Sequence, residues 1–107
     1  MNLESTLQER GNRYGEFAQH AEIAQALQDV MRRAPGWGRL AADQAQALSV
    51  IADKIARILN GDPDYIDNWH DVQGYARLVE QRLLKLKTGA QTQATAPEIA
   101  MALVEDH

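Results

Sequence analysis

The sequence contains no cysteine and no long apolar run. Without cysteine the chain has no disulfide framework, no thiolate metal site and no cysteine nucleophile, which fits a reducing cytosol. No segment approaches the roughly 18 to 20 apolar residues that a membrane span needs, and the opening MNLESTLQERGNRYG lacks the apolar centre of a signal peptide. We therefore expect a soluble cytoplasmic protein with no membrane partner.

An excess of positive charge is also missing. The formal net charge is −4, and both signs are mixed along the 107 residues. This balance argues against non-specific attraction to nucleic acid or to anionic lipid, so we expect no nucleic-acid partner. Walker, GxGxxG and Ser-His-Asp patterns are absent too, which excludes the common nucleotide loops and a serine triad. A chain of this length forms one small domain with one core.

Strand-type alternation is absent, whereas three segments, at about 16–34, 42–59 and 67–87, repeat apolar residues with helical spacing. The second segment, which we predict to be the core helix, carries on one face Leu48, Ile51, Ala52, Ile55, Ile58 and Leu59. The stripe of the third segment consists of Trp69, Val72, Ala76, Val79, Leu83 and Leu86. Gly11 and Gly15 predict a break around Tyr14, before these helices begin.

These segments predict an all-α fold, most simply an antiparallel bundle over residues 1–89, with the helix at 16–34 packed across the other two. Residues 90–96, AQTQATA, predict a linker, and a capping box with an early proline predicts a short helix at 97–107. The apolar residues of that helix, Ile99, Leu103 and Val104, need a partner surface. A homodimer is the simplest solution, and folding back onto the same chain is the alternative.

Acidic residues gather at the start of the third helical segment, in GDPDYIDNWHD. One interpretation is structural: Asp67 caps the helix, while Asp62 and Asp64 form the turn before it. The other is functional, because Asp67 and Asp71 are four residues apart and share one helix face, where they can hold a hard cation. Arg57 from the preceding helix then faces them, either as part of a phosphate site or as a structural partner of Asp71.

Three stretches of the chain, RGNRYGEFAQHAEIAQAL, IADKIARILNGDPDYI and DNWHDVQGYARL, resemble a family of small bacteriophage and prophage proteins of uncharacterised function. Three separated motifs in the same order carry that resemblance: an R-x-x-Y-G start, a K-I-A-R-I helix and a D-x-W-x-D-x-x-G-Y helix. More distantly, NWHDVQGYARL is similar to the E-x-x-D helix of the MazG-like all-α nucleoside triphosphate pyrophosphohydrolases. Those enzymes release pyrophosphate from a nucleoside triphosphate, using Mg²⁺ held by acidic residues of two adjacent helices.

This resemblance implies a nucleotide ligand, Mg²⁺ as cofactor and a homo-oligomer. Asp71 and Asp67 would be catalytic, and together with Glu16 they would hold the metal. The residues that would bind the ligand are Lys54, Arg57, Arg13 and Tyr75.

The chain departs from the enzyme pattern at several positions. Asn68 replaces the glutamate of E-x-x-D, and the E-x-x-E pair of the preceding helix is replaced by Asp53, Lys54 and Arg57. These changes remove negative charge that would position metal ions. Two functions remain open: a MazG-like pyrophosphohydrolase or degenerate nucleotide-binding relative, and a non-catalytic phage accessory protein that binds a host or phage protein.

Overall fold

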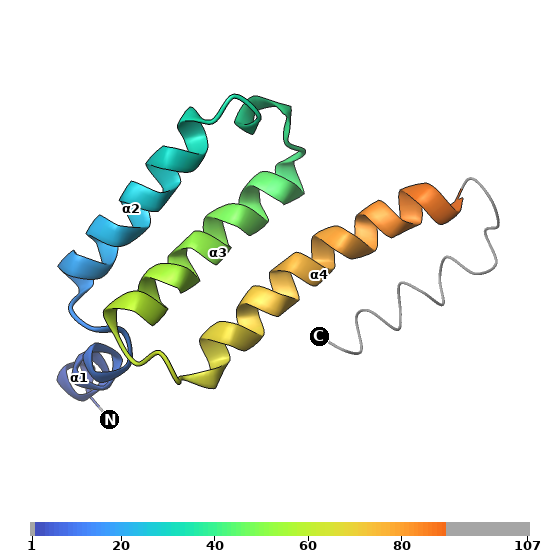
Figure 1. The fold of residues 1–107 in the computed structure, drawn as a ribbon. Coiled ribbons are helices and arrows are strands. Elements are labelled where there is room, and N and C mark those ends of the chain that lie inside the picture. The colour runs from blue at the N-terminus through green and yellow to red at the C-terminus, as the bar shows by residue number, and fades with distance from the viewer. Residues whose placement is uncertain (1, 90–107) are drawn as a thin grey trace.

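A computed structural model describes residues 2–89, which form four α-helices and a 3-10 turn and no strand (Figure 1). The elements are α1 (Leu3–Tyr14), α2 (Phe17–Arg33), η1 (Trp37–Arg39), α3 (Ala42–Asn60) and α4 (Ile66–Gly89). The predicted all-α fold is confirmed. The predicted linker at 90–96 and helix at 97–107 lie outside the described residues. None of the described helices is long and apolar enough to cross a lipid bilayer.

The helices α2, α3 and α4 lie side by side in one layer, with α3 in the middle and successive helices running in opposite directions (Figure 1). The first helix, α1, lies at one end of this layer and contacts both α2 and α3. We predicted that the helix at 16–34, which corresponds to α2, packs across both later helices. This prediction is wrong, because α2 lies against α3 on the side away from α4. Short connections place each helix next to its neighbour in the sequence.

Small side chains form the contact surfaces between these helices. Within residues 2–89 the buried apolar side chains are all alanine, namely Ala24, Ala47, Ala52 and Ala56. Alanine lets two helices approach closely but buries little apolar area. Several of the large apolar residues that we predicted for the core of the second segment are exposed instead, including Leu48, Ile55 and Leu59.

The fourth helix also turns an unexpected face toward α3. Asn68 and Gly74 are buried on α4, and two ion pairs, Lys54–Asp71 and Asp43–Arg82, join the two helices. The predicted apolar stripe faces elsewhere, and its exposed members include Trp69, Leu83 and Leu86. The spacing of the stripe correctly identifies a helix. It does not identify the side that the neighbouring helix covers.

The predicted break around Tyr14 is confirmed, because α1 continues through Gly11 and ends at Tyr14, where Gly15 adopts a positive φ of 76°. The start of the last helix differs from the prediction at Asp67, which we predicted as its cap. Asp67 instead lies in the first turn of α4, where its Oδ2 accepts a hydrogen bond from the Tyr65 hydroxyl at 2.9 Å. The acidic turn before it is confirmed, because Asp64 N–H donates to Asp62 Oδ1.

Candidate functional site

Hydrogen bonds to the backbone of the connection between α1 and α2 hold it against the end of α3. The Asn60 side-chain amide donates to the carbonyl oxygens of Tyr14 and Glu16 at 2.9 and 3.0 Å. The Asp62 N–H donates to the carbonyl oxygen of Arg13 at 2.6 Å. Gly15 fits between these partners because a Cβ atom there would collide with the Asn60 backbone. These contacts fix the positions of the side chains on both sides of the connection.

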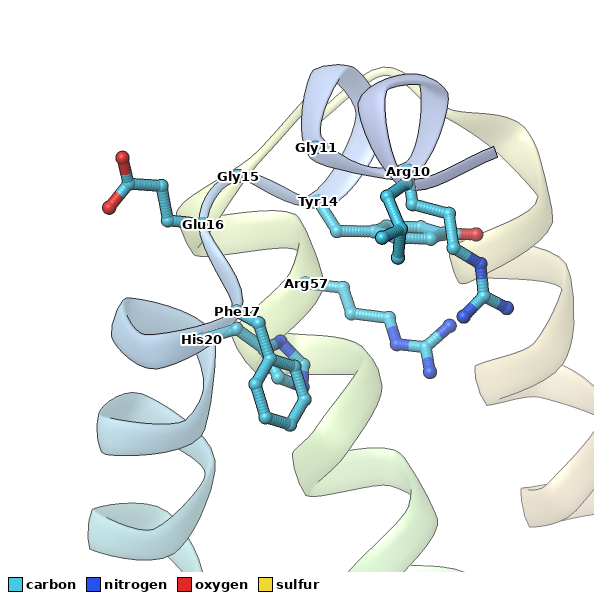
Figure 2. A pocket seen from close by; sticks show the side chains of 9 residues that line it. Arg10, Gly11, Tyr14, Gly15, Glu16, Phe17, His20 and Arg57 are labelled. Atoms are coloured by element: carbon cyan, nitrogen blue, oxygen red, sulfur yellow. The ribbon is translucent and has the colours of Figure 1, made fainter. Parts of the chain in front are cut away.

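A pocket of about 450 Å³ lies beside this connection, between the end of α1, the start of α2 and the last turns of α3 (Figure 2). Its volume is within the usual range for small-molecule sites. Its lining residues are Leu7, Arg10, Gly11, Tyr14, Gly15, Glu16, Phe17, His20 and Arg57.

The charged groups that reach this pocket are mainly cationic. Arg10 and Arg57 both line the pocket, whereas Figure 2 shows the carboxylate of Glu16 pointing away from these two arginines. Arg57 Cζ lies 4.7 Å from the centre of the Tyr14 ring, and Arg57 Nε donates to Asp53 Oδ2 at 3.1 Å. These contacts hold the guanidinium of Arg57 in place while leaving it at the pocket wall. Because Asp53 offsets the charge of Arg57, the excess positive charge at the pocket comes from Arg10.

A histidine and a phenylalanine form the α2 side of the pocket. His20 is 7% exposed, and its Nε2 lies 2.9 Å from Asp53 Oδ1. A carboxylate only accepts hydrogen bonds, so Nε2 carries a proton and donates it. Among the described residues the other ring nitrogen, Nδ1, is buried and has no hydrogen-bond partner. Phe17 stacks on the imidazole with ring centres 6.0 Å apart, and its own side chain is 80% exposed.

The residues predicted as a metal site do not lie together in the structure. Asp71 Oδ2 pairs with Lys54 Nζ at 2.8 Å, and the Lys54 side chain is only 14% exposed. The alternative that Asp71 pairs with Arg57 is wrong, because Arg57 pairs with Asp53 one turn away on α3. Within residues 2–89 no group of three histidine, cysteine or acidic residues is placed to hold a metal ion.

Asp67 belongs to a separate group of side chains near the end of α1. Arg13 Nη1 donates to the Tyr65 hydroxyl at 3.2 Å, and that hydroxyl donates to Asp67. The hydrogen bond to Asp67 and partial burial raise the pKa of Tyr65 above its ordinary value. Arg13 also pairs with Glu9 at 2.6 Å. This group joins α1 to the start of α4.

The remaining predicted residues are separated as well. Glu16 contributes its backbone to the pocket region but directs its carboxylate outward (Figure 2). Tyr75 is 36% exposed on α4. Of the predicted ligand-binding residues, Arg57 lines the pocket.

The sequence did not predict most of the pocket residues, among them Arg10, Tyr14, Phe17 and His20. Part of the signal was available, because Phe17 and His20 are three residues apart on one helix and therefore share a face. The contact between His20 and Asp53 joins residues 33 positions apart. Helical periodicity cannot identify such a pair, because it relates residues within one helix only.

Comparison with known protein families matches residues 3–83 to DUF6378, a domain of unknown function. No curated protein and no solved structure matches the chain significantly. The matched range covers α1, α2 and α3 completely and most of α4, so it contains every residue that lines the pocket. The chain therefore belongs to the DUF6378 family.

Proposed function

We propose that this protein binds a nucleotide in the pocket between α1, α2 and α3. The observation that supports this most directly is the combination of two guanidinium groups, from Arg10 and Arg57, with the aromatic rings of Tyr14 and Phe17 in one pocket. Guanidinium groups bind phosphate oxygens in a bidentate manner, and aromatic faces stack on bases. The resemblance to MazG-like pyrophosphohydrolases supports the same class of ligand.

The proposal concerns binding, and hydrolysis is a separate question. Lys54 already balances the charge of Asp71, and Asp67 accepts the Tyr65 hydroxyl. A protein-held Mg²⁺ needs carboxylates that are close together, and one copy of the described chain does not gather them. The residues present therefore do not fit a resident metal. Mg²⁺ enters this proposal only as the counterion that accompanies the phosphates of a nucleotide.

Arg10 provides the cleanest test of the proposed pocket. It is exposed on α1 and reaches the pocket, so its removal should leave the fold intact. We expect Arg10→Ala to weaken nucleotide binding about tenfold or more, because one charge-assisted contact to phosphate is lost. Isothermal titration with a panel of nucleoside mono- and triphosphates, with and without Mg²⁺, measures this loss, and pyrophosphate release is followed in the same samples.

Arg33→Ala is the matched control. Arg33 lies in the last turn of α2, at the opposite end of that helix from the pocket, and its removal changes the net charge equally. Equal losses in both variants would indicate only non-specific attraction, and absence of binding by the wild-type protein to every nucleotide would refute the proposal.

A second function, binding to another protein, is favoured by a different observation. Leu48, Ile55 and Leu59 lie at spacings of seven and four on α3, and their side chains are 40%, 38% and 67% exposed. Apolar side chains grouped on one exposed helix face are typical of protein interfaces. This face supports the accessory-protein alternative and also a homodimer, since a second copy is the simplest partner.

A further inference from the structure

The outer face of α4 carries an apolar groove that no described helix covers. Its lining residues include Ala76, Val79, Leu83, Leu86 and Lys87. Leu83 and Leu86 are 41% and 65% exposed. This surface is distinct from the nucleotide pocket, whose lining residues belong to the other three helices or to their connections.

Part of the groove faces away from α3. Buried Gly74 and half-buried Gln81 mark the covered side of α4, and they are seven residues apart on one face. Ala76 and Leu83 each follow these residues by two positions, which corresponds to a rotation of about 200° around a helix. The part of the groove around Ala76 and Leu83 is thus turned away from this covered side.

The segment that follows α4 has the composition to fill this groove. Residues 97–107, PEIAMALVEDH, lie outside the described residues, and their pattern predicts a helix with Ile99, Leu103 and Val104 on its apolar side. Consecutive helices joined by short connections usually pack against each other. The seven residues at 90–96 are within the usual length of a connection between antiparallel helices.

We propose that residues 97–107 form a fifth helix that packs antiparallel to α4 in this groove. The lengths agree, because at 1.5 Å per residue both this segment and the stretch from Ala76 to Leu86 are about 15 to 17 Å long. The charges agree as well. Antiparallel packing places Glu98, at the start of the segment, near Lys87, which lines the groove. Covalent connection gives this segment an advantage over any separate partner, since its effective concentration is about millimolar.

The absence of native cysteine makes a disulfide-trapping experiment direct. In the full chain, Leu83→Cys combined with Ile99→Cys places one thiol in the groove and one at the same level on the apolar side of the antiparallel segment. We expect this pair to close an intramolecular disulfide about tenfold faster than the control, because docking brings the two thiols together. Free-thiol titration and non-reducing electrophoresis at several protein concentrations follow the reaction.

The control combines Lys85→Cys with Ile99→Cys. Lys85 is exposed and is only two residues from Leu83, so the chain between the thiols has nearly the same length. Position 85 lies on the other side of α4, however, and a docked segment does not reach it. Equal closure rates in the two variants would refute docking. Disulfides that form mainly between two chains would also refute it, and would assign the groove to a second copy.

Discussion

Gly11 and Gly15 are four residues apart, but only Gly15 occupies a position that requires glycine. Gly11 lies within α1 with open space where a Cβ would be, whereas Gly15 has a φ of 76° and packs against the Asn60 backbone. We expect Gly11→Ala to raise the free energy of unfolding by about 0.5–1 kcal/mol, because alanine restricts the unfolded chain and favours the helix. Gly15→Ala should lower it by about 1–3 kcal/mol through backbone strain. Urea unfolding of both variants checks the signs, and a neutral Gly15→Ala contradicts the structure.

Asp71 offers a second prediction for a single residue. Lys54 is mostly buried and has Asp71 as its ion-pair partner, so Asp71→Asn leaves an ammonium group with a weaker acceptor. We expect a loss of about 1–3 kcal/mol in the free energy of unfolding. The control is Asp29→Asn, which breaks the exposed Arg33–Asp29 pair and should change stability by less than about 1 kcal/mol. Unchanged stability together with lost nucleotide binding would instead indicate that Asp71 belongs to the ligand site.

The pairing of α3 with α4 depends on ion pairs at separate places along the two helices. Arg82 Nε donates to Asp43 Oδ2 at 2.6 Å, which connects the first turn of α3 to the C-terminal half of α4. The hydrogen bond from Arg82 holds the pKa of Asp43 below its ordinary value of 3.8. A carboxyl group whose native pKa is lowered stabilises the fold above its ordinary pKa, and this contribution is lost as the pH falls through the native value.

We therefore expect Asp43→Asn to lower Tm at neutral pH, and we expect this difference from the wild-type protein to disappear in acid below the native pKa of Asp43. Thermal unfolding across a pH series measures the difference. Amide hydrogen exchange should be faster in the last turns of α4 in the variant at neutral pH, because that end of the helix loses its connection to α3. Equal Tm values for both proteins at neutral pH would show that the Asp43–Arg82 pair does not stabilise the fold.

Within residues 2–89 the helices α2, α3 and α4 form a single layer, and one layer cannot enclose a large core. Domains are usually built from two packed layers, whereas the described residues bury only alanine as apolar side chains. We expect a second copy to pack on the exposed face of α3, so Ile55→Glu should weaken dimerisation about tenfold or more by placing a charge in the interface. Light scattering over a concentration series measures this effect. Gln46→Glu on the same helix is the control, and a wild-type protein that stays monomeric at all concentrations refutes the dimer.

The sequence by itself determined the all-α fold and the approximate bounds of three helices. Helical periodicity and the turn residues around Pro35 and Gly61 depend on contacts between neighbours in the chain, so they can be interpreted without a structure. The first helix was harder to predict, because Gly11 is tolerated inside α1 despite its low helix propensity.

Only the tertiary structure decided which helix faces are covered and which charges meet. A stripe of apolar residues has the same spacing whether it faces a neighbouring helix or solvent. The stripe on α4 therefore could not identify the face that α3 covers. Arg57 and Asp53 are four residues apart on α3, so their pairing depends on local spacing that the sequence already shows. The pairing of Asp71 with Lys54, in contrast, depends on how α3 and α4 are rotated about their axes. The pocket depends on the same kind of information, because Arg10, His20 and Arg57 come from three helices whose relative positions are set by packing rather than by local sequence.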